Sequence, residues 1–401
     1  FGVDNMKNIL NTNVFIVGAT RTPIGKFQGY LSETPVTELS NVAISGAIKK
    51  SGNKPDEIDY VILGNMLTAG VGMTPARQAA VLAGLPVTTP ALTVNNACAS
   101  GMQAVIIASQ NIQLQECSTV LAGGMENMSK SPHILVNSRT GTRMGNDLIV
   151  DTMINDGLWC PFENRHMGDS AEVIAKKYSI TREQQDAFAE NSHLKALNAK
   201  THNYFNNEIT PITVTKKKST SVVSDDEGPR KDINLEKLNS LKAVFNLGKT
   251  VTSGNASQIS DGASAMVVCN EKSVKTNSGP IALITGYSYV ANEPGLLFDA
   301  PYKAVEDLLQ KTGGTISDFD LIEINEAFSA QVLANEKKIG WDIDIVNIHG
   351  GAIALGHPVG ASGARIITTL IHALSLNKLN HGLAIICHGG GGAAAMSLEL
   401  V

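Results

Sequence analysis

The sequence predicts an α/β fold made of two similar halves, with a further domain inserted into the first half. Three segments of the first half recur in the same order 261 to 265 residues later, which indicates an internal duplication. In both halves, short apolar runs alternate with helix-like stretches, as in layered α/β proteins. Two segments that adjoin in the second half are separated in the first by about 130 residues, and a gap of that size in one copy indicates an insertion.

The repeated segments place the elements of each half in order. SGNKPDEIDYVILG from Ser51 parallels TGGTISDFDLIEIN from Thr312, and each is a polar turn followed by an apolar strand. CASGMQAVI from Cys98 parallels GASGARIIT from Gly360, and each opens a helix-like stretch. VLAGG parallels IICHG as a further strand, and the halves close with DGASAMVV and GGAAAMSL. The predicted strands are VFIV from Val14, YVIL from Tyr60, TVL from Thr119, LIEI from Leu321, IVNI from Ile345 and LAIIC from Leu383.

The inserted segment contains a predicted helix. Thr181 and Gln184 have the spacing of a capping box, which closes the first turn of a helix. The side chains expected to share one face of this helix are Ala187, Phe188, Asn191 and Leu194.

These patterns give the domain boundaries. We place the first half at residues 6–128 and 260–279, the insertion at residues 129–259, and the second half at residues 280–401. Two similar halves that pack together bring their strand ends to a shared seam, so the site is expected there.

Composition excludes several classes of protein. The formal charge of -5 gives no reason to expect nucleic-acid or anionic-membrane binding. The five cysteines lie far apart without metal-ligand spacing, so neither a disulfide scaffold nor a metal module is expected. A membrane helix needs a run of about 18 apolar residues, and no run in the chain approaches that length.

The N-terminus sets the expected location. Residues 1–5 precede Met6 and are interpreted as a remnant ahead of a native start, without a secretory pattern. A cytoplasmic protein is therefore expected, with the mitochondrial matrix as the alternative if a transit peptide has been removed.

Cys98 is the first candidate for chemistry. It follows the strand ALTVN and precedes the helical run ASGMQAVIIASQ, so it lies at or near a helix N-terminus. Unpaired amides and the helix dipole at such a position stabilise a thiolate and can hold a negative oxygen. The alternative is a small buried core cysteine. Its neighbours lack bulky side chains, which favours a site that a ligand can reach.

His357 is the second candidate, in the segment GGAIALGHPVGASGAR. Pro358 restricts His357 to an extended backbone, and the surrounding glycines allow a substrate to approach closely. A lone histidine is more often structural, but this one lies in the segment that mirrors the Cys98 turn. That correspondence favours a catalytic role.

Two further strand ends carry reactive or polar groups. Cys387 ends the strand LAIIC and leads into a run of glycines beginning at Gly389, whose amides can form an oxyanion hole. Asn325 follows the strand LIEI and is suited to orient a water molecule or a carbonyl group. Their alternatives are a core cysteine and a surface turn. Two cysteines, a histidine and an asparagine fit acyl transfer, in which one thiolate attacks and another group moves a proton.

The motifs NNACASGMQA, AGGMENMS, INEAF, GGAIALGHPVGASGAR and CHGGGGAAAM, in this order, resemble the thiolase family across nearly the whole chain. The resemblance implies the duplicated thiolase fold, with two βαβαβαββ halves in a layered α/β/α/β/α arrangement and an inserted loop domain. It further resembles acetoacetyl-CoA thiolase of the biosynthetic and mitochondrial type. Thiolases act on acetyl-CoA, acetoacetyl-CoA and CoA, and a homotetramer, a dimer of dimers, is expected.

The resemblance also implies roles for individual residues. Cys98 would be the nucleophile that becomes acylated, and His357 the base that activates it. Cys387 would be the second acid and base, while His357 and a water molecule held by Asn325 would stabilise the enolate. The amides of Cys98 and Gly389 would bind the oxygen of the acyl group.

Binding residues follow from the same motif positions. His166 would contact the thioester arm of the ligand, and Met167 would narrow the acyl pocket, which favours a short acyl chain. The remaining residues implied to contact the ligand are Arg230, Lys237, Ser257 and Phe328. A potassium ion is implied near Ser253, Gly254 and Ala256, although His193 stands where that site has a tyrosine; no other metal and no cofactor beyond CoA is expected.

His388 departs from the family pattern, because a small or amide residue is commoner after the second cysteine. We interpret it as a group that shifts the pKa of the Cys387 thiol.

Three functions are alternatives to acetyl transfer: a 3-ketoacyl-CoA thiolase of β-oxidation with broader chain length, a decarboxylating ketosynthase, and a non-catalytic CoA-binding scaffold. The ketosynthase is disfavoured because its usual Cys-His-Asn arrangement leaves Cys387 without a role.

Overall fold

The computed structural model describes residues 12–216, 219–275 and 279–401. Residues 1–5, interpreted above as a remnant ahead of a native start, lie outside these ranges.

The first half has the predicted alternation of strands and helices. Its elements are β1 (Val14–Arg21), β2 (Gly25–Lys26), α2 (Val36–Ser51), β3 (Tyr60–Gly64), α3 (Pro75–Leu82), β4 (Ala91–Val94), α4 (Ser100–Gln113), β5 (Thr119–Asn127) and β12 (Ser260–Asn270). β3 pairs in parallel with both β4 and β5. β12 pairs antiparallel with β5, so the chain returns from the insertion beside the strand that it left.

The second half repeats this order, except that its described residues contain no strand equivalent to β2 or β4 and include the additional short helix α10. Its elements are β13 (Ala282–Ala291), α8 (Ala300–Thr312), β14 (Leu321–Ile324), α9 (Ser329–Ile339), α10 (Ala352–Leu355), α11 (Val359–Asn377), β15 (His381–His388) and β16 (Gly392–Leu400). The strand predicted at IVNI is wrong, since Ile343–Ile345 form a 3₁₀ turn and Val346 makes a single bridge to Ile322. The side chain of Asn347 replaces the missing ladder, because it accepts from Ile324 N and donates to Ile324 O, each at 2.9 Å.

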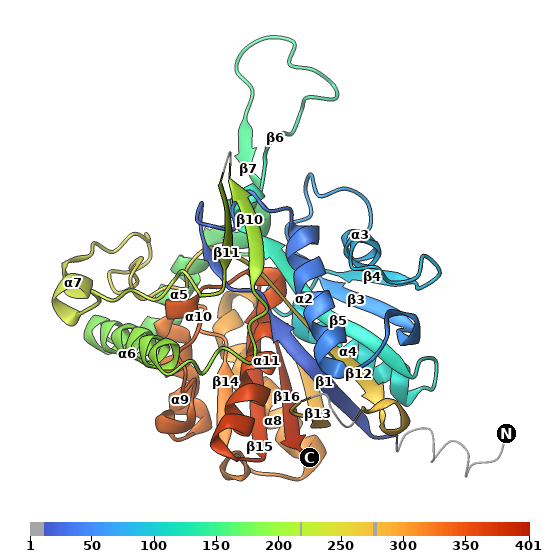
Figure 1. Ribbon diagram of the computed structural model, residues 1–401. Helices are drawn as coiled ribbons and strands as arrows, with labels where there is room; N and C mark the ends of the chain where they lie inside the picture. The colour runs from blue at the N-terminus through green and yellow to red at the C-terminus, as the bar shows by residue number, and fades with distance from the viewer. Residues whose placement is uncertain (1–11, 217–218, 276–278) are drawn as a thin grey trace.

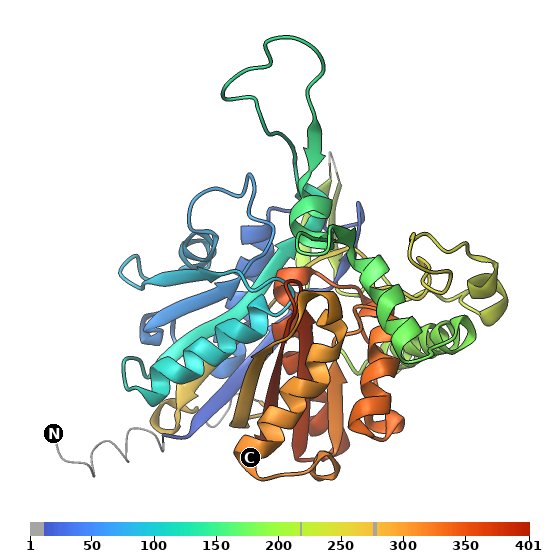
Figure 2. The same cartoon turned by 180° about the vertical axis from the view of Figure 1, so that it is seen from behind.

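The strands form one mixed sheet of ten, in the order β14-β15-β16-β13-β1-β12-β5-β3-β4, with β2 paired to β12. β1 and β13 join the halves. α4 and α11 contact each other and lie between the two half-sheets, while α2 and α3 cover one outer face and α8 the other (Figures 1 and 2). This is the predicted α/β/α/β/α layering. Among the described helices, α11 alone is long and apolar enough to cross a membrane, but 89% of that window is buried inside the protein, as in a core helix.

Two glycines allow the central helices to touch. A Cβ atom at Gly101 of α4 would lie 2.8 Å from the backbone nitrogen of Ala364, and one at Gly363 of α11 would lie 2.4 Å from that of Met102. Either contact is too short for a side chain, so both positions require glycine. The N-terminal turns of α4 and α11 therefore approach backbone to backbone, which brings the Cys98 and His357 segments together.

The insertion lies beside the seam and also extends away from it. Its elements are β6 (His133–Leu135), β7 (Ile149–Asp151), a π-helix (Met153–Leu158), β8 (Trp159–Cys160), β9 (Arg165–His166), α5 (Met167–Lys177), α6 (Arg182–Thr201), β10 (Ile212–Lys216), β11 (Ser219–Val223) and α7 (Leu235–Ser240). The β6–β7 hairpin projects from the body of the molecule in both views (Figures 1 and 2).

The predicted helix of the insertion is α6, and its capping box between Thr181 and Gln184 is present. The predicted face is wrong, because Asn191 is exposed and Leu194 is 51% exposed. The buried face is instead partly polar, and its members are Gln185, Asp186, Ala189, Ser192, His193, Ala196 and Ala199. An apolar pattern could not reveal this face, since buried polar groups such as Asp186 are matched by partners distant in sequence, here Asn255 at 2.8 Å.

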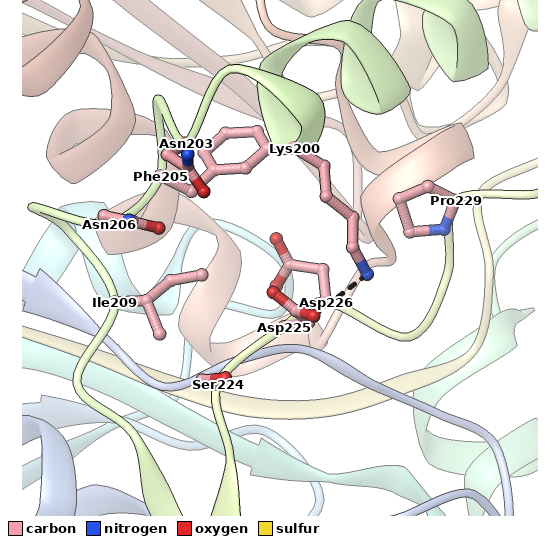
Figure 3. A pocket seen from close by; sticks show the side chains of 9 residues that line it. All are labelled: Lys200, Asn203, Phe205, Asn206, Ile209, Ser224, Asp225, Asp226 and Pro229. Atoms are coloured by element: carbon pink, nitrogen blue, oxygen red, sulfur yellow. Dashed lines mark ion pairs between the residues drawn. The ribbon is translucent and has the colours of Figure 1, made fainter.

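A buried arginine fastens the insertion to the first half. The guanidinium of Arg21 is fully buried and donates to Glu208 at 2.6 Å and to both oxygens of Asp226 at 2.6 and 2.8 Å. Figure 3 shows Asp226 in a pocket beside the neighbouring ion pair of Lys200 and Asp225, which spans 3.2 Å. Because the two carboxylates belong to the insertion and Arg21 to β1, this network holds the two parts in register.

We expect Arg21→Met to destabilise the protein strongly. It would leave Glu208 and Asp226 buried without their shared cation, and removing one partner of a buried ion pair costs about 3–5 kcal/mol. Urea unfolding would measure the loss. The matched control is Lys26→Met, because the Lys26 side chain is 57% exposed in its pair with Glu227 and should cost under about 1 kcal/mol. Equal losses for the two variants would contradict this account.

Candidate active site

A cavity of about 880 Å³ lies at the seam of the two halves and the insertion, and it is open to solvent. Eight of the predicted catalytic and ligand-binding residues line it, and these are Cys98, His166, Met167, Ser257, Phe328, His357, Cys387 and Gly389. They come from all three parts of the chain, so the strand ends converge as predicted.

Cys98 lies in a strained turn between β4 and α4. Ala97 has a φ of 46°, in the left-handed region that non-glycine residues seldom adopt. The hydroxyl of Ser100 holds the turn closed, accepting from the Asn96 N–H at 2.8 Å and donating to the Ala97 carbonyl at 2.6 Å. This geometry presents Cys98 to the cavity just before the first residue of α4.

The Cys98 thiol is protonated at rest. Burial raises its pKa to about 11, against the opposing effect of the Gly389 N–H and its own N–H. Nucleophilic attack needs the thiolate, so a base must take the proton. These two amides are also the donors predicted to bind an acyl oxygen.

His357 is held in one tautomer. Ser362 donates its hydroxyl proton to the Pro358 carbonyl at 2.9 Å, so it accepts a hydrogen bond from Nδ1 of His357 at 2.5 Å. Nδ1 therefore bears the proton and Nε2 carries a lone pair. Burial, aided by the nearby Arg365 cation, lowers the His357 pKa to about 3, so the imidazole is neutral throughout the physiological range and its Nε2 lone pair is available to accept a proton.

Cys387 ends the buried part of β15, and its sulfur shares the cavity with Cys98. Burial raises its pKa above the usual value for a thiol, and the neighbouring Cys98 raises it further. The resting group is thus a neutral thiol able to donate a proton. Its thiolate, once formed, is a strong base.

Asn325 lies behind His357. Its Nδ2 is 3.4 Å from Nε2 of His357, and the residue is fully buried. Its Oδ1 has no hydrogen-bond partner among the described residues. A buried amide oxygen without a protein partner is suited to a water molecule, which agrees with the predicted role.

The wall of the cavity includes residues that the sequence did not indicate. His166 stacks on Phe245 with ring centroids 5.0 Å apart, Phe245 meets Phe328 edge-on at 6.5 Å, and Phe328 meets Phe298 at 5.5 Å. These four rings form a row along the cavity. Other lining residues that the sequence did not indicate are Met128, Leu158, Leu297 and Val359. No local motif marks these residues, because they come from apolar segments that are far apart in the chain.

Two predicted CoA-binding residues lie outside this cavity. Arg230 donates its backbone N–H to Nδ1 of His193 at 3.1 Å, and Lys237 forms an exposed ion pair of 2.6 Å with Asp232. Burial lowers the pKa of His193 to about 4, so this histidine is neutral. Of the residues implied near potassium, Ala256 lines the cavity while Ser253 and Gly254 do not. Contacts of Arg230 and Lys237 with CoA, and the potassium ion, stay predictions.

Comparison with known proteins agrees with this arrangement. Family models for the thiolase N-terminal and C-terminal domains match residues 14–272 and 278–400. An acetyl-CoA acetyltransferase of Chromobacterium violaceum is 46% identical, over 96% of this chain and 99% of the relative, and one of Cupriavidus necator is 45% identical, over 97% and 99%. The crystal structure of the Bacillus anthracis acetyl-CoA acetyltransferase superposes with a TM-score of 0.95 at 41% identity, covering 97% of this chain and 99% of that one. The matches cover both halves, the insertion and the site between them. This chain therefore belongs to the thiolase family.

Proposed function

We propose that the protein is an acetyl-CoA C-acetyltransferase, which reversibly converts two molecules of acetyl-CoA into acetoacetyl-CoA and CoA. The observation that supports it most directly is the pair of thiols, Cys98 and Cys387, in one cavity with the neutral base His357. The names of the related proteins support the same reaction. CoA serves as substrate and product, and we propose no further cofactor.

In the direction of cleavage, the first step forms an acetyl-enzyme. His357 takes the Cys98 proton, and the thiolate attacks the 3-keto carbon of acetoacetyl-CoA. The amides of Cys98 and Gly389 bind the oxygen as it becomes negative. The carbon–carbon bond breaks, and the neutral Cys387 thiol protonates the departing enolate to give acetyl-CoA. His357 and the water molecule bound by Asn325 stabilise that enolate before it is protonated.

The second step returns the enzyme to its starting state. The Cys387 thiolate is a strong base and takes the thiol proton of an incoming CoA. The CoA thiolate attacks the acetyl group on Cys98, and Cys98 leaves and recovers its proton from His357. One acetyl-CoA is released at each step, and synthesis of acetoacetyl-CoA is the reverse sequence.

Thiolysis of acetoacetyl-CoA by CoA tests the activity directly, and the chain-length profile tests its specificity. The row of rings from His166 to Phe298 and Met167 line the cavity, and we infer that they restrict it to a short acyl group. Each misplaced methylene costs about 1–3 kcal/mol in such a pocket, so kcat/KM should fall at least about 100-fold from acetoacetyl-CoA to 3-ketohexadecanoyl-CoA. Comparable rates would favour the broader 3-ketoacyl-CoA thiolase, and no thiolysis at all would favour the non-catalytic scaffold.

We also propose that the chain assembles as a homotetramer. The projecting hairpin exposes apolar side chains, among them Leu148 at 68% and Ile149 at 63%, and β4 leaves one edge of the sheet unpaired within the described chain. Contacts with other subunits that cover the hairpin and the β4 edge would explain why both are exposed in a single chain. We expect Leu148→Asp with Ile149→Asp to reduce the particle mass measured by light scattering from four chains to two, whereas Lys130→Asp should leave it unchanged. A wild-type monomer would contradict the proposal.

A further inference from the structure

His388 lines the active-site cavity but has no part in the steps proposed above. It is the last residue of β15, between the Cys387 thiol and a loop of glycines from Gly389 to Gly392 that leads into β16. A polar side chain in such a place needs a partner, and its partner is the loop itself.

The contact defines the state of the imidazole. Nδ1 of His388 lies 2.8 Å from the carbonyl oxygen of Gly389, and a carbonyl only accepts, so Nδ1 is the donor. The ring also lies close over Gly392, since a Cβ atom there would be 2.2 Å from Nε2. Both the neutral tautomer with a proton on Nδ1 and the fully protonated ring supply this hydrogen bond.

The loop has few other means of holding its shape. Gly390 and Gly391 have φ values of 91° and 97°, and glycine loses more conformational freedom on folding than any other residue. At the far end of the loop, the Asn292 N–H donates to the Gly391 carbonyl at 2.5 Å. At the near end, His388 holds the carbonyl of Gly389, which lines the cavity with Cys98 and whose N–H opposes the rise in the pKa of the Cys98 thiol.

We propose that His388 is a positioning residue that fixes Gly389 so that its N–H faces the Cys98 sulfur and the oxygen of the acyl group. This inference rests on the proposed function. It is an alternative to the interpretation of His388 as a group that shifts the pKa of Cys387, because the Nδ1 proton of His388 is directed to the Gly389 carbonyl. The oxyanion donor serves both half-reactions, so His388 should affect both.

The test compares two substitutions of similar shape. His388→Asn keeps an N–H donor at the position of Nδ1, whereas His388→Leu fills the same space without a donor. We expect His388→Leu to lower kcat about 10- to 100-fold, less than the roughly 100- to 1,000-fold loss on removing an oxyanion donor outright, with little change in KM. His388→Asn should recover most of this loss, and its pH profile should match that of the wild type because the role needs no titration.

Two half-reactions locate the effect. Exchange of labelled CoA into acetyl-CoA follows acylation, and single-turnover condensation follows the step that uses Cys387; His388→Leu should slow both alike. A loss confined to condensation, an asparagine variant as slow as leucine, or a leucine variant as fast as wild type would each overturn the inference. His381→Leu, exposed at the other end of β15, is the control, and His388→Ala makes the same comparison if leucine prevents folding. Wild-type protein without acetyl transfer would instead refute the proposed function.

Discussion

Replacing Cys98 by serine is expected to remove acetyl transfer almost completely. His357 can deprotonate the thiol because the Gly389 and Cys98 amides stabilise the resulting sulfur anion, but a serine hydroxyl is a far weaker acid and a poorer leaving group from the acyl-enzyme. We expect thiolysis and CoA exchange each to fall at least about 10,000-fold, as for the loss of other enzyme nucleophiles. Mass spectrometry of the intact protein after exposure to acetyl-CoA should show an added acetyl group on the wild type and none on the variant.

Cys117→Ser is the matched control for this experiment. Cys117 is a partly buried free cysteine that lies outside the cavity lining, so its variant should keep the acetyl adduct and nearly all of the activity. Normal turnover by Cys98→Ser, or an adduct that disappears with Cys117, would show that the nucleophile has been misassigned.

The duplication is the reason that so much of the fold followed from the sequence. Once the Cys98 and Gly360 segments were recognised as copies, the order of strands and helices in one half predicted that in the other. The exception is instructive. IVNI has the composition of a strand, but Asn347 adopts a φ of 45° and uses its side chain to pair with Ile324. A side-chain substitute for a backbone ladder depends on a tertiary contact and has no local signature.

The catalytic groups were predictable for a similar reason. Cys98, Asn325 and His357 each follow a strand or precede a helix, Cys387 lies near the end of β15, and ends of this kind meet at the seam of a duplicated α/β fold. Which atoms touch was not predictable. The tautomer of His357 depends on Ser362, and the shape of the glycine loop depends on His388. Single hydrogen bonds of this kind are decided by final packing, not by spacing in the chain.

The insertion was the least predictable part. The buried face of α6 is partly polar and differs from the predicted face, and the ring of Phe245 reaches the cavity from a segment without regular structure. Acidic side chains on α5 hold that segment, since Asp169 accepts from the Asn246 and Leu247 N–H groups and Glu172 accepts from that of Val251. Buried carboxylates whose hydrogen bonds are all made order a loop as firmly as an apolar core does, but they leave no periodic pattern in the sequence.

Replacing Cys387 by serine should separate the two half-reactions. In acylation by acetyl-CoA, Cys387 only exchanges a proton with CoA, and a thiol is acidic enough to leave or attack as its own thiolate. Exchange of labelled CoA into acetyl-CoA should therefore stay within about tenfold of the wild-type rate. Carbon–carbon bond formation needs a base strong enough to remove an α-proton. The Cys387 thiolate is that base, because burial raises the pKa of the Cys387 thiol. A serine hydroxyl is too weakly acidic to supply the corresponding anion, so condensation and thiolysis should each fall at least about 1,000-fold.

The contrast between the two cysteine variants is more informative than either loss alone. Cys98→Ser should lose the acetyl adduct together with all turnover, whereas Cys387→Ser should accumulate the adduct and fail to discharge it by condensation. A purely structural effect would lower the rates of both half-reactions together. Cys269→Ser is the control for the size of such an effect, because Cys269 is fully buried and lies outside the cavity. If Cys387→Ser instead lost exchange and condensation in equal measure, the two sulfurs could not have the separate roles that their shared cavity and unequal surroundings assign to them.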